Sequence, residues 1–373
     1  MRPSGGGRRV RADRGVYSCR ASVSLASAWA SVGQPMTVSE EFISRTGRFR
    51  GELLAHIYRM LGSADEAEDL VQETYLRAWR SYDKFEGRSS VRTWLYRIAT
   101  NVSLTAIQRR GRRPLPSGLG APSSDPEAPL VAGPEVPWLQ PLPDALLGAE
   151  QEDPAAVVAS RAGIRLAFVA ALQYLPARQR AVLLLRDVLE WPAAEVAELL
   201  GTTTTAVNSG LRRARAQLAR ALPVEEELAE PAEAERRALL ERFAAAIEHA
   251  DDSALAALLA EEVALEMPPL LSWFSGRQAV VRVVAGHLLT GPGRLRLVAV
   301  MANGQPAFAV YQREPGGAYQ AHAVLVLTVA ATGIARIVAF LNPGLFASFG
   351  LPPEYGAAGP VPTQDQAVPP WPR

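Results

Sequence analysis

The stretch DEAEDLVQETYLRAWRSYDKFEGRSSVRTWLYRIATN, residues 65–101, is the most informative part of the chain. Its first half predicts an acidic amphipathic helix, and a short glycine-containing turn leads into a basic second half. Between Arg88 and Arg113 there are seven arginines and no acidic residue, with Trp94 and Tyr96 inside that run. Arginines bind phosphates and aromatic rings stack on unpaired bases, so the basic half suits a single-stranded or opening nucleic acid. The acidic half would repel phosphate, and we expect it to face a protein partner.

A second DNA-binding pattern occupies residues 159–222. Two short predicted helices flank Gly201; Pro192 marks the start of the first, and the threonines at 202–205 supply a cap for the second. Apolar residues recur in the second helix at helical spacing and predict one buried stripe, formed by Val207, Leu211, Ala214 and Leu218. Because arginines and small polar residues lie off this stripe, the pattern is typical of a helix-turn-helix.

These motifs resemble the sigma-70 superfamily, in its extracytoplasmic-function branch. Asp69-Leu70-Val71-Gln72-Glu73 and Arg92-Thr93-Trp94-Leu95-Tyr96-Arg97-Ile98-Ala99-Thr100-Asn101 are similar to sigma region 2; Ala206-Val207-Asn208-Ser209 and Arg212-Arg213-Ala214-Arg215 are similar to region 4. The resemblance implies a non-catalytic sigma factor that directs transcription initiation in the cytoplasm. Its implied partners are core RNA polymerase and promoter DNA, read at the −10 and −35 elements. The alternative for the first motif alone is an ordinary amphipathic helix pair with a solvated basic face.

The resemblance also implies a role for individual positions. Those implied to bind core polymerase are Asp69, Gln72 and Glu73. Those implied to bind −10 DNA are Phe85, Arg88, Ser89, Arg92 and Asn101. Those implied to read −35 DNA are Asn208, Ser209, Arg212, Arg213 and Arg215. The chain departs from the family pattern at Thr105, where relatives often have Asp, and at Gly210, where they often have a longer side chain.

The segment between the two motifs, residues 114–158, is rich in proline and glycine. From Pro114 to Pro154 it holds seven acidic residues and no Lys or Arg. Such a composition buries too little apolar surface to offset the entropy of ordering, so we expect it to be extended when free. In the resembling family this linker threads through the RNA channel of the polymerase; a plain spacer is the alternative. Trp138 and Leu139 indicate a docking spot within it.

The C-terminal part predicts an α+β domain with a cone-like cavity between sheet and helices. The expected elements are a helix over 234–260, a strand over 263–267, a helix over 278–289 and antiparallel strands over 295–301, 307–313, 319–329 and 334–341, with a turn at Asn303-Gly304. Met267-Pro268-Pro269, Trp273-Phe274-Ser275-Gly276-Arg277 and Ala339-Phe340-Leu341-Asn342-Pro343-Gly344-Leu345-Phe346 resemble the SnoaL-like branch of the NTF2-like fold. The candidate regulatory positions are Met267, Trp273, Arg277, His322, Asn342 and Pro343.

This resemblance leaves two functions open for the C-terminal domain. Relatives include cyclases with an acid/base group in the cone, for which Glu266, His287 and His322 are the candidates here. A cyclase- or isomerase-type enzyme module, or one that binds a small ligand, is therefore the alternative. No carboxylates converge on a histidine in the sequence, and no metal-ligand spacing occurs. We therefore expect a domain that regulates the sigma factor, with no metal and no cofactor.

The predicted organisation has seven parts. In order these are a disordered extension or mis-assigned start (1–38, with Met36 as the other start), region 2 (39–113), the linker (114–158), region 4 (159–222), an acidic connector (223–236), the SnoaL-like domain (237–350) and a disordered tail (351–373). A single cysteine, Cys19, excludes an internal disulfide framework. No apolar run approaches the roughly 20 residues of a spanning helix, so we expect no membrane partner.

Overall fold

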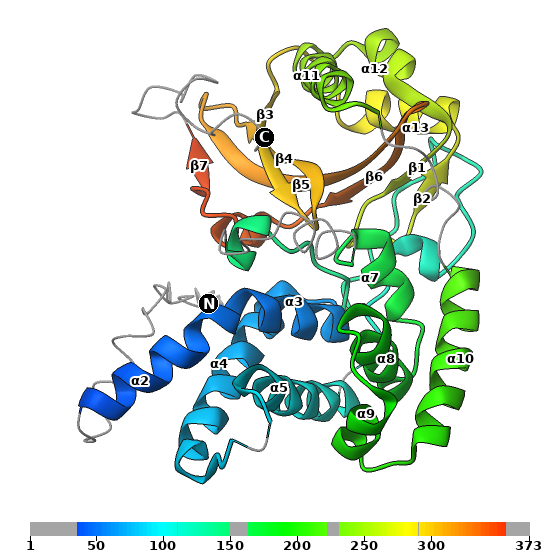
Figure 1. Ribbon diagram of the computed structural model, residues 1–373. Coiled ribbons are helices and arrows are strands. Elements are labelled where there is room, and N and C mark those ends of the chain that lie inside the picture. The colour runs from blue at the N-terminus through cyan, green and yellow to red at the C-terminus, as the bar shows by residue number, and fades with distance from the viewer. Residues whose placement is uncertain are drawn as a thin grey trace, which may run out of the picture. The chain divides into compact units, whose positions relative to one another are not determined.

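The computed structural model describes residues 36–87, 89–109, 111–148, 163–221, 231–289 and 291–355. The chain forms two compact units, 1–47 and 48–373, and the described part of the first is essentially helix α2 (Met36–Thr46). Nearly all of the expected N-terminal extension, most of the expected tail and Arg88 lie outside the described residues. The helices and strands of the second unit are labelled in Figure 1.

Three helices form the first bundle of this unit: α3 (Arg50–Leu61), α4 (Ala64–Arg80) and α5 (Val91–Gln108). Gly62 ends α3 in the left-handed conformation, and Ser63 then caps α4 by accepting the main-chain N–H of Glu66 at 3.3 Å. Ser90 caps α5 in the same way, through the N–H of Thr93 at 3.0 Å. These caps explain why the chain reverses twice within a few residues, which brings the acidic and basic halves of the motif side by side.

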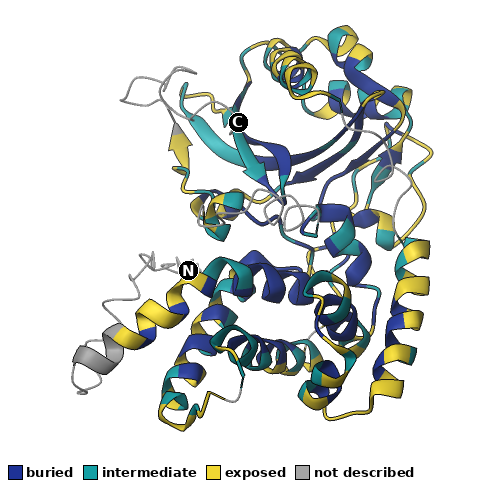
Figure 2. Ribbon diagram, viewed as in Figure 1, coloured by how far each residue is buried: buried dark blue, intermediate teal, exposed yellow. Residues whose placement is uncertain are grey.

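A second group of helices follows: α7 (Leu166–Leu172), α8 (Ala177–Leu183) with a π-helical turn at Leu184–Val188, α9 (Ala193–Leu200) and α10 (Thr204–Ala221). Pro192 immediately precedes α9, and Gly201 ends it with a positive φ. The hydroxyl of Thr203 accepts the N–H of Ala206 at 3.2 Å, so the threonine cluster caps α10 as expected. Figure 2 shows the long exposed face of α10.

The C-terminal domain pairs helices α11 (Glu233–His249), α12 (Asp252–Leu258) and α13 (Arg277–His287) with a seven-stranded sheet. Its strands are β1 (Leu259–Glu266), β2 (Trp273–Ser275), β3 (Leu295–Ala302), β4 (Gln305–Arg313), β5 (Tyr319–Ala330), β6 (Gly333–Phe340) and β7 (Glu354–Tyr355). The strand order is β2-β1-β6-β5-β4-β3, with β7 against β5. The expected helices followed by an antiparallel meander are confirmed in β3 to β6.

Three details of this domain differ from expectation. The single helix expected over 234–260 is two helices, because Ala250 adopts a left-handed conformation and Asp251 caps α12. The sheet is mixed, because β1 runs parallel to β6. Strand β7 orders part of the segment expected to be a disordered tail.

Apolar side chains of the sheet and its helices face one another. Leu240, Phe243, Val280, Val283, Phe308 and Leu327 belong to one buried apolar cluster there, and the rings of Phe243 and Phe308 are 5.9 Å apart. Burial of each such side chain contributes roughly 1.5–3 kcal/mol. In the described residues, sheet and helices therefore share one hydrophobic core.

The described part of the linker, 114–148, is packed rather than free. Leu139 and Leu142 are 1% and 0% exposed, and short bridges join Ala132 to Leu270 and Pro143 to Ala302 of the C-terminal domain. The expectation of an extended linker rested on its scarcity of apolar residues. The few apolar residues of the linker suffice to order it, because other parts of the chain supply the surfaces that cover them.

Candidate nucleic-acid and partner interfaces

Helix α4 has one buried face and one exposed face. The buried face comprises Ala64, Ala67, Val71, Thr74, Tyr75 and Ala78. On the opposite face Asp69 and Gln72 are exposed, together with Leu76 at 45%. Glu73 is half-buried and accepts a hydrogen bond from Nε of Arg77 at 2.6 Å. Two of the three positions expected to bind polymerase are thus exposed, and the third is paired along its own helix.

The turn before α5 is shaped by aromatic contact. The Phe85 ring lies 4.8 Å from that of Trp94, and both side chains are half-buried. Ser89 is half-buried as well. Asn101, further along α5, is exposed. Trp94 therefore packs against the turn, and Asn101, two helical turns further along α5, presents an amide to solvent.

An acidic partner that the sequence analysis missed lies on α3. Glu52 accepts hydrogen bonds from Nε of Arg92 at 2.7 Å and from the hydroxyl of Tyr96 at 3.2 Å. Tyr96 is 1% exposed, and its burial raises the pKa of its hydroxyl. Its ring meets those of His56 and Trp191 edge-on, so Tyr96 packs the helices together. No sequence signal singled out Glu52, because it stands 40 residues before Arg92.

Helix α10 separates its core stripe from its polar face. Val207, Leu211 and Ala214 are buried, and Leu218 is half-buried. The expected DNA-reading side chains are Asn208, Arg212, Arg213 and Arg215, which are exposed, and Ser209, which is half-buried. Arg215 forms a two-pronged ion pair with Asp187, at 2.8 and 2.7 Å. Asp187 and Arg215 are 28 residues apart, and the sequence pattern did not predict their pairing.

Residues 50–113 and 163–221 contact each other directly; we call this set of contacts the closed arrangement. Arg97 on α5 pairs with Glu198 on α9 at 2.8 Å. Nε of Arg59 donates to the carbonyl of Gly163 at 2.7 Å. Arg180 donates through Nη1 to the carbonyl of Met60. Each contact joins one predicted DNA-binding part to the other.

The turn between β3 and β4 reaches into this arrangement; we call Asn303 and Gly304 the β3–β4 turn. Asn303 is 0% exposed, with a φ of 59° that asparagine tolerates better than most residues. Its Nδ2 donates to the Tyr58 hydroxyl at 2.8 Å and to the Ile164 carbonyl at 2.7 Å. Its Oδ1 accepts the N–H of Leu142 at 2.9 Å. One side chain of the C-terminal domain therefore bonds α3, the linker and the segment that precedes α7.

Two neighbours extend this network. The N–H of Gly304 donates to Asp144 at 2.8 Å. Oε1 of Gln305, which is 4% exposed, accepts the N–H of Leu166 at 2.9 Å. The sequence analysis treated Asn303-Gly304 only as a turn signal, because a turn's chemistry says nothing about what the turn contacts.

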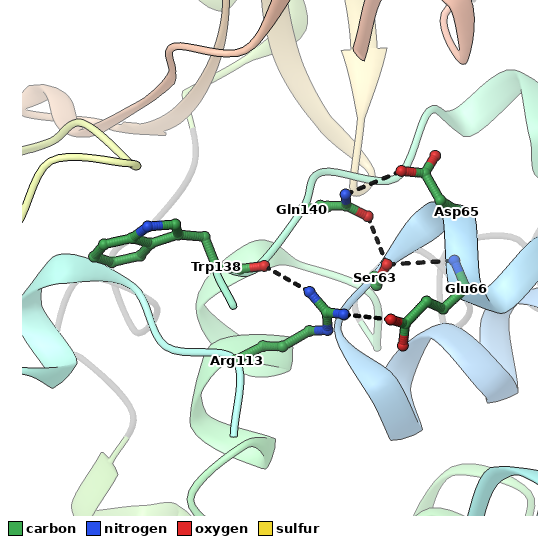
Figure 3. Close-up of polar contacts among 6 residues, drawn as sticks. All are labelled: Ser63, Asp65, Glu66, Arg113, Trp138 and Gln140. Carbon is green, nitrogen blue, oxygen red and sulfur yellow. Dashed lines mark hydrogen bonds and ion pairs between the residues drawn. The ribbon is translucent and has the colours of Figure 1, made fainter. Parts of the chain in front are cut away.

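The linker docks on the start of α4, as Figure 3 shows. The Ser63 hydroxyl donates to Oε1 of Gln140 at 2.6 Å, and Nε2 of Gln140 donates to Asp65 at 3.0 Å. Arg113 bridges the Trp138 carbonyl, at 3.2 Å, and Glu66, at 2.5 Å. In the docking spot expected around Trp138 and Leu139, only the Trp138 carbonyl joins this network, whereas its indole Nε1 donates to the Gly133 carbonyl within the linker at 2.9 Å.

The candidate regulatory residues of the C-terminal domain occupy different environments. Met267 is in the core, and Nε1 of Trp273 donates to the Gly120 carbonyl in the linker at 2.9 Å. Arg277 donates to the Leu259 carbonyl and pairs with Glu261. Asn342 and Pro343 are exposed, and Asn342 caps the 3-10 turn Pro343–Ala347. The structure does not bring these residues together in one site.

The three acid/base candidates do not converge either. Glu266 is 0% exposed; it pairs with Arg336 and accepts the N–H of Ser117 at 2.9 Å. His322 is the extra residue of a β-bulge, half-buried, and burial lowers its pKa. His287 faces the Val283 carbonyl on its own helix. Within the described ranges, no group of three metal-ligating side chains occurs, and no helix is long and apolar enough to cross a membrane.

Comparison with known families matches three parts of the chain. The sigma-70 region 2 family matches residues 47–113, the sigma-70 region 4 family matches residues 165–218, and the SnoaL-like domain family matches residues 240–338.

Individual relatives match different shares of the chain. The chain is 51% identical over 314 residues to "ECF RNA polymerase sigma factor SigG" of Mycobacterium tuberculosis (strain H37Rv), covering 84% of each chain. It is 30% identical over 174 residues to SigJ of the same organism, covering 46% of this chain and 48% of SigJ. The crystal structure of Mycobacterium tuberculosis SigJ superposes with a TM-score of 0.55 at 24% identity, covering 84% of this chain and 100% of that one; this likeness concerns the fold.

Proposed function

Because the chain belongs to the extracytoplasmic-function family of RNA polymerase sigma factors, we propose that its two helical parts divide polymerase docking and promoter reading between them. The protein is a non-catalytic transcription initiation factor. It acts with RNA polymerase core on promoter DNA, in the cytoplasm. The roles of single residues and of the C-terminal domain are the substance of the proposal.

Polymerase core binds the exposed face of α4 through Asp69, Gln72 and Glu73. Exposure of Asp69 and Gln72 supports this role, since a docking side chain has to be accessible before the partner arrives. Leu76 adds an exposed apolar side chain to the same face. An exposed acidic face with one apolar anchor suits a basic protein surface better than it suits DNA.

The −10 element is captured by the turn before α5. Asn101 holds a base that leaves the stack, and Phe85, Arg88, Ser89 and Arg92 contact the strand around it. The packing of Phe85 on Trp94 supports this role, because a pre-ordered turn loses less entropy on binding. Arg92 is already paired with Glu52. It therefore contributes to DNA binding by fixing the start of α5 and by a positive charge that Glu52 partly offsets.

The −35 element is read by α10. Hydrogen-bond donors and acceptors that match base edges in the major groove are presented by Asn208, Ser209, Arg212 and Arg213. The observation that carries this assignment is the alternation on α10, where a buried apolar stripe stands opposite exposed arginines and amides. Arg215 reaches DNA only after it leaves Asp187.

The C-terminal SnoaL-like domain regulates promoter binding by holding the closed arrangement. Asn303 supports this role most directly, because it bonds α3, the linker and the segment before α7 at once. The covalent tether gives the domain an effective concentration on the order of millimolar, so even a weak contact is largely occupied. The acid/base candidates Glu266, His287 and His322 lie on different elements and do not converge, which favours regulation over catalysis.

Run-off transcription with core polymerase tests the proposal. The full chain is compared on a duplex promoter with a chain ending at residue 222 and with a control ending at residue 355. The control keeps β7 and removes only residues 356–373. We expect transcription to require promoter sequence in every case, the cut at 222 to change the rate several-fold, and the control to match the full chain. Equal rates for all three chains contradict the regulatory role, and promoter-independent rates contradict the sigma assignment.

A further inference from the structure

A small cavity lies within the closed arrangement. It has a volume of about 160 Å³, room for about five water molecules in the liquid state. Its walls come from the ends of α3 and α5, the start of α4 and the segment between α7 and α8. The polar lining comprises Glu66, Arg112, Arg113, Gln173 and Arg180.

The lining carries excess positive charge. Arg113 is paired with Glu66, as Figure 3 shows, so one carboxylate offsets one of the three guanidinium groups. Arg112 lies over the Tyr174 ring, 4.7 Å from its centroid, and donates to the Gly118 carbonyl at 3.4 Å. In the described part of the chain, neither Arg112 nor Arg180 forms an ion pair with a carboxylate.

Arg180 is the unusual member of this lining. It is 4% exposed, and its partners are all neutral: the Met60 carbonyl, Oε1 of Gln173 at 2.8 Å and the Leu175 carbonyl at 3.2 Å. Its Nε has no hydrogen-bond partner in the described structure. A buried cation with only neutral partners is costly unless a counter-charge is near, and burial lowers the pKa of Arg180 to about 10.

An anion in the cavity would supply that counter-charge. Guanidinium groups bind oxyanions through paired N–H donors, and phosphate matches this geometry well. We infer that this cavity is a binding site for a phosphate group, which Arg112 and Arg180 hold between them. Arg112 is exposed, so the group enters from solvent on that side.

Occupation of the cavity would affect both DNA-binding parts. Arg112 follows α5, whereas Arg180 belongs to α8, so a phosphate held by both bridges the two halves of the closed arrangement. The bridge stabilises that arrangement by mass action, because the site exists only while the halves are in contact. This consequence rests on the proposed function, whereas binding itself does not.

Binding is measured on the full chain without polymerase. Thermal unfolding is measured at increasing concentrations of inorganic phosphate. Sodium chloride at matched ionic strength is the control. We expect Tm to rise with phosphate beyond the chloride effect, and phosphorus NMR to show broadening of the phosphate signal by the protein. A phosphate response no larger than that of chloride overturns the inference.

Variants locate the site. Arg112→Gln and Arg180→Gln should each weaken phosphate binding about tenfold or more, as expected for loss of a charge-assisted hydrogen bond. Arg109→Gln, in the same basic run but outside the cavity lining, should leave binding unchanged. Because Arg180 is buried, the circular-dichroism spectrum of Arg180→Gln must first show that this variant folds. If Arg180→Gln unfolds, Arg112→Gln alone tests the site. Equal phosphate binding by Arg112→Gln and Arg109→Gln contradicts the assignment.

A second arm identifies the source of the phosphate group. A short single-stranded oligonucleotide is titrated against the phosphate-loaded protein. Release of phosphate that depends on Arg112 assigns the site to a nucleic-acid backbone, and retention assigns it to free phosphate. Failure of run-off transcription with intact phosphate binding would remove the proposed function and leave this site standing.

Discussion

Asn303→Ala is expected to destabilise the closed arrangement by several kcal/mol. The wild-type side chain makes three buried hydrogen bonds, to Tyr58, Leu142 and Ile164, and is 0% exposed. Each such bond contributes about 0.5–1.5 kcal/mol. Alanine at a φ of 59° adds about 1–2 kcal/mol of backbone strain. The sum is about 2.5–6.5 kcal/mol, a large fraction of the stability of a typical domain.

The measurement is hydrogen exchange at the main-chain amides of Leu142 and Leu166, together with urea unfolding. Asn303→Gly is the matched control, because it removes the same three bonds but accepts the positive φ without strain. We expect Asn303→Ala to be less stable than Asn303→Gly by about 1–2 kcal/mol, and both to expose the Leu142 amide. If Asn303→Ala retains wild-type exchange at Leu142 and Leu166, the β3–β4 turn does not hold the linker and region 4.

Four further predictions concern promoter binding and acid stability. Asn101→Ala should abolish opening of a duplex promoter while core binding persists, measured by permanganate footprinting; native-like opening would refute base capture. Reversing the charge of Asp69 together with Glu73 should weaken core binding, measured by fluorescence anisotropy, since the contacts are charge-assisted. Arg213→Ala should cost about 1–3 kcal/mol and relax preference at one −35 position; an unchanged footprint and salt dependence would exclude it as a reader. Burial lowers the pKa of His56 from 6.5 to about 3, so the unfolded chain binds a proton that the folded chain does not. Stability should therefore fall as the pH drops from 6.5 towards 3, by up to about 1.4 kcal/mol per pH unit, and His56→Gln should flatten this dependence in urea titrations.

Local patterns predicted the elements well where side-chain periodicity was strong. The stripe Val207, Leu211 and Ala214 is buried as its spacing requires, and strands β3 to β6 lie within a residue or two of their expected bounds. The pattern failed at Ala250, because an alanine in the left-handed conformation carries no local signal. It also missed the parallel pairing of β1 with β6, because strand direction depends on the path of the intervening chain.

For the site residues too, periodicity indicated exposure but not the partners of each side chain. The exposure of Asp69, Gln72 and Asn101 follows from their places on amphipathic helices, which periodicity already indicates. Their roles stay predictions. The partners of the arginines did not follow from sequence: Arg92 pairs with Glu52, and Arg215 with Asp187, across turns whose geometry no pattern specifies.

The sequence by itself determined the family and most of the helices and strands, because caps, periodicity and motifs are local properties of the chain. Only the tertiary structure decided what the linker and the β3–β4 turn do. A proline-rich acidic segment has too few apolar residues to order itself, yet Leu139 and Leu142 are buried by surfaces far away in sequence. Asn303 is likewise an ordinary turn residue until folding brings Tyr58, Leu142 and Ile164 within hydrogen-bonding distance. Such contacts depend on long-range packing, which neighbouring residues along the chain do not encode.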